Sequence, residues 1–277
     1  MNNTFRTFML MTVLTVMFVW LGGLAGGRAG AFLAFLIAAG INFYSYWFSD
    51  KMVLKRYQAR EVGPDDHPRL YHIVADLAQN AGLPMPKVYI LPDSTPNAFA
   101  TGRNPEHAAV AATEGILQLL DDDELAGVMA HELAHVKHRD ILTGTIAATI
   151  AGAIAMLGQM ARFGAGGSRR GGNPIAALLL MVAAPLVAMI IRMAISRVRE
   201  YAADQGGAEI SGKPLALASA LNKLQHGVER QPMQNGNPAH SHMFIVYPFF
   251  GGASRLLSTH PPMEERIRRL EAMAQGR

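Results

Sequence analysis

VMAHELAHVKHRD, residues 128–140, holds two histidines four positions apart with a glutamate directly after the first. On an α-helix, residues i and i+4 share a face, so His131 and His135 can both present a ring nitrogen to one ion. Glu132 lies about 100° further round the helix, badly placed as a ligand but able to reach a water on the metal. The stretch therefore predicts a helix with a catalytic zinc site rather than an ordinary polar helix edge.

The residues on either side of this stretch agree with a helix. The acidic run DDDE, residues 121–124, precedes it, and Lys137, His138 and Arg139 follow the second histidine. Acids near the start and bases near the end of a helix complement its dipole, and aspartate is a favoured N-cap. We expect the acidic run to cap the start of this helix.

The composition indicates a membrane protein with a soluble part. Half of the 277 residues are apolar and only 17% are charged, a low share for a soluble protein. The net charge of +4 is too small and too scattered to suggest nucleic-acid binding. The chain has no cysteine, which excludes disulfides and a cysteine nucleophile and leaves histidine and carboxylate ligands for a metal.

Two uncharged runs near the start, residues 8–24 and 29–48, are each close to the roughly 20 residues that cross a bilayer. Arg28 lies in the glycine-rich turn between them, so we expect a transmembrane hairpin. A cleaved signal peptide over residues 1–27 is the alternative, but it leaves the second run to be placed. The positive-inside rule puts the end of the second run in the cytoplasm, because four basic residues follow it: Lys51, Lys55, Arg56 and Arg60.

The segment 64–127 is predicted to be soluble, and the whole chain is predicted to be an α+β protein that is mainly helical with a small β-sheet. The expected elements of this segment are, in chain order, a helix that stops at Gly82, strands at 87–91, 97–101 and 107–112, and a helix at 114–120. Further helices are expected near residues 213–228 and at the C-terminal end of the chain.

Two more apolar runs, residues 141–161 and 175–195, predict a second membrane hairpin and bring the total to about four transmembrane or membrane-embedded helices. A second hairpin returns the chain to the side that the histidine helix left. Glu200 follows there and is the best candidate for a third zinc ligand. Asp204, one helical turn further on, would accept a hydrogen bond from the outer nitrogen of a ligand histidine.

Alternatives to this arrangement stay open. Glu200 can instead pair with a neighbouring arginine on a solvated helix, and His240 and His242 are rival ligands in a loop rich in glycine, asparagine and proline. Between the last two apolar runs lie three arginines: Arg162, Arg169 and Arg170. If the second hairpin crossed the bilayer fully, these arginines would lie outside, against the positive-inside rule. Partial embedding of this hairpin in the membrane is therefore also open.

The predicted domain organisation has four parts. They are an N-terminal transmembrane hairpin at 1–50, the first part of a metal-binding domain with the histidine helix at 51–140, a second membrane hairpin at 141–195, and the rest of the metal-binding domain with the third ligand at 196–277.

Taken together, the chain resembles the HtpX-type membrane zinc metalloproteases, which are gluzincins related to the CAAX prenyl endopeptidases. The resemblance covers nearly the whole chain. It rests on the N-terminal apolar hairpin and on four motifs in order: PNAFATGR (96–103), HELAHVKHRD (131–140), SRVREYAAD (196–204) and STHPPMEERI (258–267). It implies a zincin-like fold and one Zn²⁺ per chain, held by His131, His135 and Glu200, with Glu132 as the catalytic glutamate.

Beside this resemblance, further residues become candidates for the site. One segment could form an edge strand that pairs with an extended substrate through main-chain hydrogen bonds: Asn97, Ala98, Phe99 and Ala100. The alternative is that this segment is an ordinary buried strand. His260 and Arg266 are candidate donors to the oxyanion of a tetrahedral intermediate, although each could equally tie the terminal helix to the domain.

The resemblance also implies a function and a location. We expect an endopeptidase that hydrolyses misfolded or damaged membrane proteins, in the lipid bilayer of a bacterial inner membrane, multi-pass, with its site facing the cytoplasm. The alternative is a non-catalytic membrane-bound holdase or adaptor with a structural zinc, although such a site needs no base at Glu132. A metal transporter is disfavoured, because the two N-terminal apolar runs carry no ionisable residue.

Overall fold

The first element is α1, Asn3–Arg56, whose 54 residues fold back on themselves as a helical hairpin. The helix breaks at Gly26 and Gly27, and Gly27 has a φ of 58° and a ψ of −144°, a conformation open mainly to glycine. Beside the turn the two arms nearly touch, because a Cβ built on Gly30 would lie 2.2 Å from the carbonyl oxygen of Gly22. The glycines therefore provide both the turn and the close packing of the arms.

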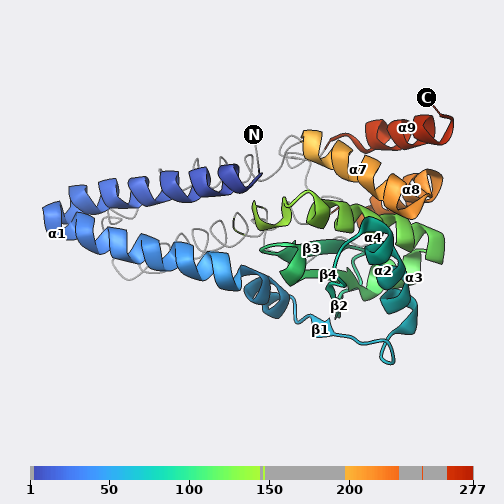
Figure 1. Ribbon diagram of the computed structural model, residues 1–277, viewed down its shortest axis with the longest axis horizontal. Coiled ribbons are helices and arrows are strands. Elements are labelled where there is room, and N and C mark those ends of the chain that lie inside the picture. Colours follow the sequence, from blue (N-terminus) through green and yellow to red (C-terminus); the bar gives the residue numbers. More distant parts are fainter. Residues whose placement is uncertain (1–2, 144–145, 147–196, 231–244, 246–260, 277) are drawn as a thin grey trace, which may run out of the picture.

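The computed structural model describes residues 3–143, 146, 197–230, 245 and 261–276. In Figure 1 the two arms of α1 project to one side, and the sheet and the other labelled helices gather at the opposite end. The described part is mainly helical with a small mixed sheet, which confirms the predicted fold class at that level. The predicted candidates that fall outside the described residues are His240, His242, His260 and almost all of the second hairpin.

The hairpin carries the apolar surface that the sequence predicts. Within the described residues, one stretch is long and apolar enough to cross a membrane, Gly26–Phe48, with 23 residues and a mean hydropathy of 1.5. A shorter apolar helix covers Thr7–Trp20 in the other arm. A polar contact joins the arms, because Asn42 Nδ2 donates a hydrogen bond to Thr15 Oγ1 over 2.7 Å.

The sheet has four strands in the order β1-β2-β4-β3. The two central strands, β2 (Lys87–Leu91) and β4 (Ala108–Thr113), run parallel to each other. The edge strands, β1 (Arg60–Glu61) and β3 (Ala98–Gly102), are antiparallel to their neighbours. A short 3-10 helix, Pro105–His107, connects β3 to β4. The structure therefore confirms the predicted edge position of β3, and it adds β1, which the sequence analysis did not predict.

Both faces of the sheet are covered. Side chains such as Val88 and Val110 join the main core with the helices, whereas Phe99 and Ala111 on the opposite face pack against the end of α1. This division follows from the strand period of two, which sends alternate residues to opposite faces. The hairpin is therefore packed onto the sheet rather than tethered to it by a loop.

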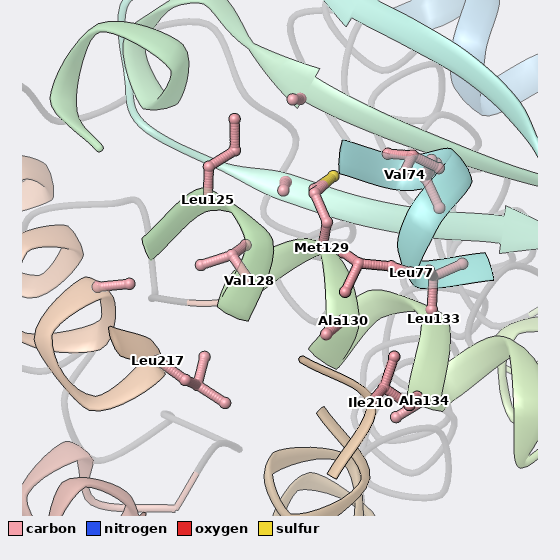
Figure 2. Close-up of a cluster of buried hydrophobic side chains, with 14 of the residues drawn as sticks. Val74, Leu77, Leu125, Val128, Met129, Ala130, Leu133, Ala134, Ile210 and Leu217 are labelled. Atoms are coloured by element: carbon pink, nitrogen blue, oxygen red, sulfur yellow. The ribbon is translucent and has the colours of Figure 1, made fainter. Parts of the chain in front are cut away.

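The remaining helices surround α4, which carries the histidine motif. Their bounds are α2 Pro68–Ala81, α3 Glu114–Leu119, α4 Asp122–Lys137, α7 Arg197–Ser211, α8 Pro214–Arg230 and α9 Met263–Ala274. Figure 2 shows side chains of α4 such as Met129 and Leu133 meeting Leu77 of α2 and Ile210 of α7. Burial on several sides holds α4 rigidly in the middle of the domain.

The start of α4 is fixed by the capping that the sequence predicts. Asp121 Oδ1 accepts a hydrogen bond from the backbone N–H of Glu124, and Glu124 Oε2 accepts one from the backbone N–H of Asp121. This reciprocal pair satisfies two N–H groups at the helix start. Lys223 of α8 also donates to Glu124, so the cap ties α4 to a neighbouring helix.

Candidate metal centre

Three ligand-type side chains meet where α4 and α7 cross. His131 and His135 lie one turn apart on α4, and their Nε2 atoms are 3.2 Å apart. The carboxylate of Glu200 on α7 approaches both, with Oε1 3.7 Å from Nε2 of His135 and Oε2 3.9 Å from Nε2 of His131. One ligand atom from each of the three residues lies within 4.8 Å of the other two.

The separations of these atoms suit a single ion. Zinc binds nitrogen and oxygen at about 2.0–2.1 Å in tetrahedral geometry, which places neighbouring ligand atoms about 3.3–3.4 Å apart. The observed separations of 3.2–3.9 Å are close to that value. Two imidazoles and one carboxylate are also a donor set of catalytic zinc sites with a fourth position left for water. The residues present therefore fit a metal ion of this kind.

Two glycines of α7 allow this crossing. A Cβ on Gly207 would lie 2.8 Å from the backbone nitrogen of His131, and one on Gly206 would lie 3.0 Å from the Cβ of Ala134. The absence of both side chains lets α7 approach the backbone of α4. Since Glu200 and Asp204 lie on the same helix as these glycines, the approach brings both carboxylates to the histidines.

The outer nitrogen of each histidine faces a carboxylate. Asp204 Oδ1 lies 3.0 Å from Nδ1 of His131, although the geometry of this contact is not that of a hydrogen bond. Both carboxylate oxygens of Asp140 lie 3.1 Å from Nδ1 of His135. Such contacts fix the tautomer of a ligand histidine and turn its other nitrogen toward the metal.

Asp140 is a site residue that the sequence analysis missed. It is buried, and it reaches His135 because the chain turns sharply after α4. Arg139 has a φ of 57°, a left-handed conformation that non-glycine residues rarely adopt. The signal available in the sequence was the acid that follows the second histidine by five positions, but its contact depends on this turn.

These carboxylates change the protonation of the site. Burial alone would lower the pKa of His135, but Asp140, Glu200 and Glu132 together raise it to about 10. Burial would raise the pKa of Asp204, but the Arg266 guanidinium and His131 hold it at about 2. Without a metal, His135 therefore keeps a proton at neutral pH, and a metal must displace it.

Glu132, the predicted catalytic glutamate, is held by the edge strand. Its Oε2 accepts a hydrogen bond of 2.8 Å from the backbone N–H of Ala100 in β3. Burial raises the pKa of Glu132, and the two histidines and the Ala100 N–H partly oppose that shift. A buried carboxylate fixed beside two candidate ligand histidines has the position of a general base.

Arg266 of α9 stands behind the ligands. It is fully buried, and its Nε and Nη2 atoms donate to both carboxylate oxygens of Asp204 over 2.8 and 2.7 Å. Its third nitrogen, Nη1, lies 3.9 Å from Oε2 of Glu200 and has no hydrogen-bond partner among the described residues. The structure therefore places Arg266 in contact with the groups that hold the site.

The other predicted substrate residues, Asn97, Ala98 and Phe99, face other parts of the fold. Asn97 is buried just before β3, and its side-chain oxygen accepts a hydrogen bond from the backbone N–H of Ile245. Ala98 faces the main core, and Phe99 faces the end of α1. Within this segment, only Ala100 has a described hydrogen bond to a site residue.

Comparisons with known proteins agree with this geometry. A profile of Peptidase family M48 matches residues 64–274. A protein of Syntrophotalea carbinolica named Protease HtpX homolog is 60% identical over 280 residues, which cover 98% of this chain and 99% of that protein. A protein of Ralstonia pickettii with the same name is 55% identical, with coverage of 99% and 98%.

A solved structure shares the fold. The crystal structure of S. mikatae Ste24p aligns with a TM-score of 0.54 and 17% identity over 97% of this chain and 65% of that one. At this identity the likeness concerns the fold alone, and the chain spans about two thirds of the length of that protein.

Proposed function

The chain belongs to peptidase family M48 and is a metalloprotease, and from this premise we propose that it is a zinc endopeptidase that cuts misfolded or damaged membrane proteins. The observation that carries the proposal is the convergence of His131, His135 and Glu200 beside the buried Glu132. These three ligands would hold one Zn²⁺ per chain. A structural zinc site has no use for a buried base next to its ligands, which disfavours a holdase or adaptor.

The residues divide the work of peptide hydrolysis. When bound, zinc polarises the scissile carbonyl and lowers the pKa of the attacking water. Glu132 accepts the proton of that water on Oε1, while Oε2 stays bonded to the N–H of Ala100, and it then delivers the proton to the leaving amine. Asp204 and Asp140 keep the ligand histidines oriented during these steps.

The outer edge of β3 is the proposed substrate track. Thr113 N–H donates to the carbonyl of Asn97, so these two residues form a hydrogen-bonded pair. Such pairs alternate along an antiparallel ladder, so residues 99 and 101 also direct their backbone groups to β4. Ala98, Ala100 and Gly102 therefore turn their backbone groups outward. Glu132 already holds the Ala100 N–H, and an extended peptide can bond to the remaining outward groups whatever its side chains are. Because Glu132 is bonded at Ala100, this register puts the scissile bond opposite Ala100.

Two further residues complete the proposal as donors to the oxyanion. Arg266 has Nη1 free for this task among the described residues, since its other two nitrogens hold Asp204. His260, outside the described residues, precedes α9 by two prolines and is the second proposed donor.

The apolar hairpin supports a location in a membrane. We place the chain in a bacterial inner membrane as a multi-pass protein, with Gly26–Phe48 as one span and the site on the cytoplasmic side. Basic residues at the domain end of the span support this orientation: Lys51, Lys55 and Arg56. A second hairpin over 141–195 belongs to the same proposal.

The test is digestion of an unfolded protein by the detergent-purified chain beside Glu132→Gln, with zinc content measured on both. We expect the parent to cut and the variant to bind zinc without cutting. Glu200→Ala is the matched control for the ligand set and should lose zinc. If Glu132→Gln cuts at the parental rate, the assigned base is wrong. If both chains hold zinc and neither cuts in detergent or lipid, the holdase function replaces the protease.

A further inference from the structure

The hairpin touches the two segments that support the catalytic groups, and we propose that it is a working part of the active site rather than only an anchor. Thr7 and Trp47, one on each arm, act as positioning residues. The first supports the turn that carries Asp140, and the second supports the strand that carries Ala100. This inference rests on the proposed zinc peptidase function.

The first contact joins the start of the hairpin to the chain just after α4. Thr7 Oγ1 and Thr143 Oγ1 share a hydrogen bond of 2.8 Å, and both side chains are almost fully buried. Thr143 lies three residues after Asp140, whose carboxylate holds Nδ1 of His135. A buried hydroxyl pair between segments 136 residues apart fixes where this turn lies relative to the hairpin.

The second contact joins the other arm to the edge strand. The guanidinium carbon of Arg103 lies 4.7 Å from the centroid of the Trp47 ring. Arg103 lies three residues after Ala100, whose N–H holds Glu132. Between them Gly102 has a φ of 135°, and a Cβ there would lie 2.3 Å from the carbonyl oxygen of His107, so the strand end has little freedom to move.

Further packing beside the second contact makes the connection between α1 and β3 stiff. Val53 and Leu54 at the end of α1 form a buried cluster with Phe99 of β3 and with the outer face of the sheet. Tyr57 adds a tilted ring contact to Phe99, with centroids 6.2 Å apart. The hairpin therefore supports the base through β3 and supports a ligand histidine through the turn after α4.

Zinc release tests the first contact without any need for cleavage. The full chain is loaded with zinc in detergent, mixed with excess chromogenic chelator, and the rate of release is recorded. We expect Thr7→Val and Thr143→Val each to raise this rate about threefold to tenfold, less than the roughly ten- to hundredfold effects of groups that touch a ligand directly. The double variant should match the single ones, because the two share one bond.

Thr15→Val is the matched control, since it removes a hydroxyl bonded to Asn42 wholly within the hairpin. It should release zinc at the parental rate. Thr7→Ser keeps the hydroxyl that bonds to Thr143, so it should also release zinc at the parental rate. Parental release from Thr7→Val, or equal acceleration in Thr15→Val, would overturn the inference. If Thr7→Val does not fold, Thr143→Val tests the same bond from its other side.

Steady-state kinetics test the second contact. We expect Arg103→Ala and Trp47→Ala to lower kcat about threefold to tenfold, because a small displacement of Glu132 slows the reaction, with KM and zinc release unchanged. Lys51→Ala is the control, since it removes a cation–ring contact to Phe48 that does not reach β3. Equal loss in this control, or a normal kcat in both test variants, would overturn this half. A parent chain that holds zinc but never cuts would instead refute the proposed function.

Discussion

Arg139 shows how the backbone of one residue supports the proposed metal site. Its left-handed backbone costs about 1–2 kcal/mol relative to a helical conformation. The turn it makes bonds Asp140 N–H to the carbonyl of His135 over 3.2 Å and brings the carboxylate of Asp140 back to the ring of the same histidine. The cost of the turn is therefore offset by the buried carboxylate–histidine contact that it creates.

The first prediction concerns this carboxylate. Asp140→Asn keeps the size of the side chain but removes the charge that stabilises His135 as a ligand, so zinc affinity should fall about 10- to 100-fold. Competition with a chelator of known affinity measures the change. Asp122→Asn makes the same substitution in the exposed first turn of α4 and should leave the affinity unchanged. Normal affinity in Asp140→Asn would show that the contact has no role in metal binding.

At the scale of residues, the sequence predicts the contacts that follow from helical spacing. The face shared by His131 and His135 and the turn from Glu200 to Asp204 follow from the period of an α-helix. Asp140 escaped prediction because its contact depends on a left-handed residue, and nothing in the sequence marks Arg139 as adopting that conformation. The contact of Ala100 with Glu132 depends on which edge of the sheet meets α4, which spacing does not reveal either.

At the scale of elements, α9 holds α7 beside the proposed metal ligands. Arg266 binds Asp204 through two hydrogen bonds, and Arg269 stacks over the ring of Tyr201 with its guanidinium carbon 3.7 Å from the centroid. Both contacts lie within four residues of Glu200. Helix α9 therefore fixes the helix that carries Glu200, the proposed third ligand, although it supplies no proposed ligand itself.

The second prediction separates these two contacts. Arg266→Met leaves the buried charge of Asp204 without its partner, so the free energy of unfolding should fall by about 3–5 kcal/mol. Adding Asp204→Asn to this variant should recover part of the loss, because both charges are then gone. Thermal unfolding in detergent measures the series. Arg269→Met is the exposed control on the same helix and should cost less than about 1 kcal/mol. An equal loss for the two arginines would contradict the prediction.

Elements were predictable where the local pattern was strong. Strand β2 has the predicted bounds, and the predicted capping of α4 is present. Strand β1 was missed because two residues, Arg60 and Glu61, carry no alternation to detect, and they form a strand only by pairing with β2. The docking of α9 depends on the charge of Arg266 meeting Asp204 across 62 positions, which no local pattern encodes.

At the scale of the whole molecule, a metal ion would join elements that are distant in the sequence. His131 and His135 come from α4, and Glu200 comes from α7. Thr7 of the hairpin bonds to Thr143 after α4, and Ala100 of β3 bonds to Glu132. A ligand that binds the folded chain alone stabilises the entire fold, so metal binding is readable as a change in global stability.

The last prediction is that zinc stabilises the chain more as the pH rises. The pKa of His135 is raised from 6.5 to about 10 in the metal-free fold. The contact of protonated His135 with Asp140 therefore stabilises the metal-free fold fully below pH 6.5, and that contribution is lost as the pH rises toward 10. Zinc must displace the proton, so its binding tightens up to about tenfold per pH unit over the same window.

Melting temperatures with and without zinc, measured between about pH 6 and pH 9, should diverge with increasing pH. Asp140→Asn lowers the pKa of His135 and should flatten this divergence, whereas a stabilisation by zinc that is independent of pH in the parent would show that His135 carries no proton in the metal-free chain.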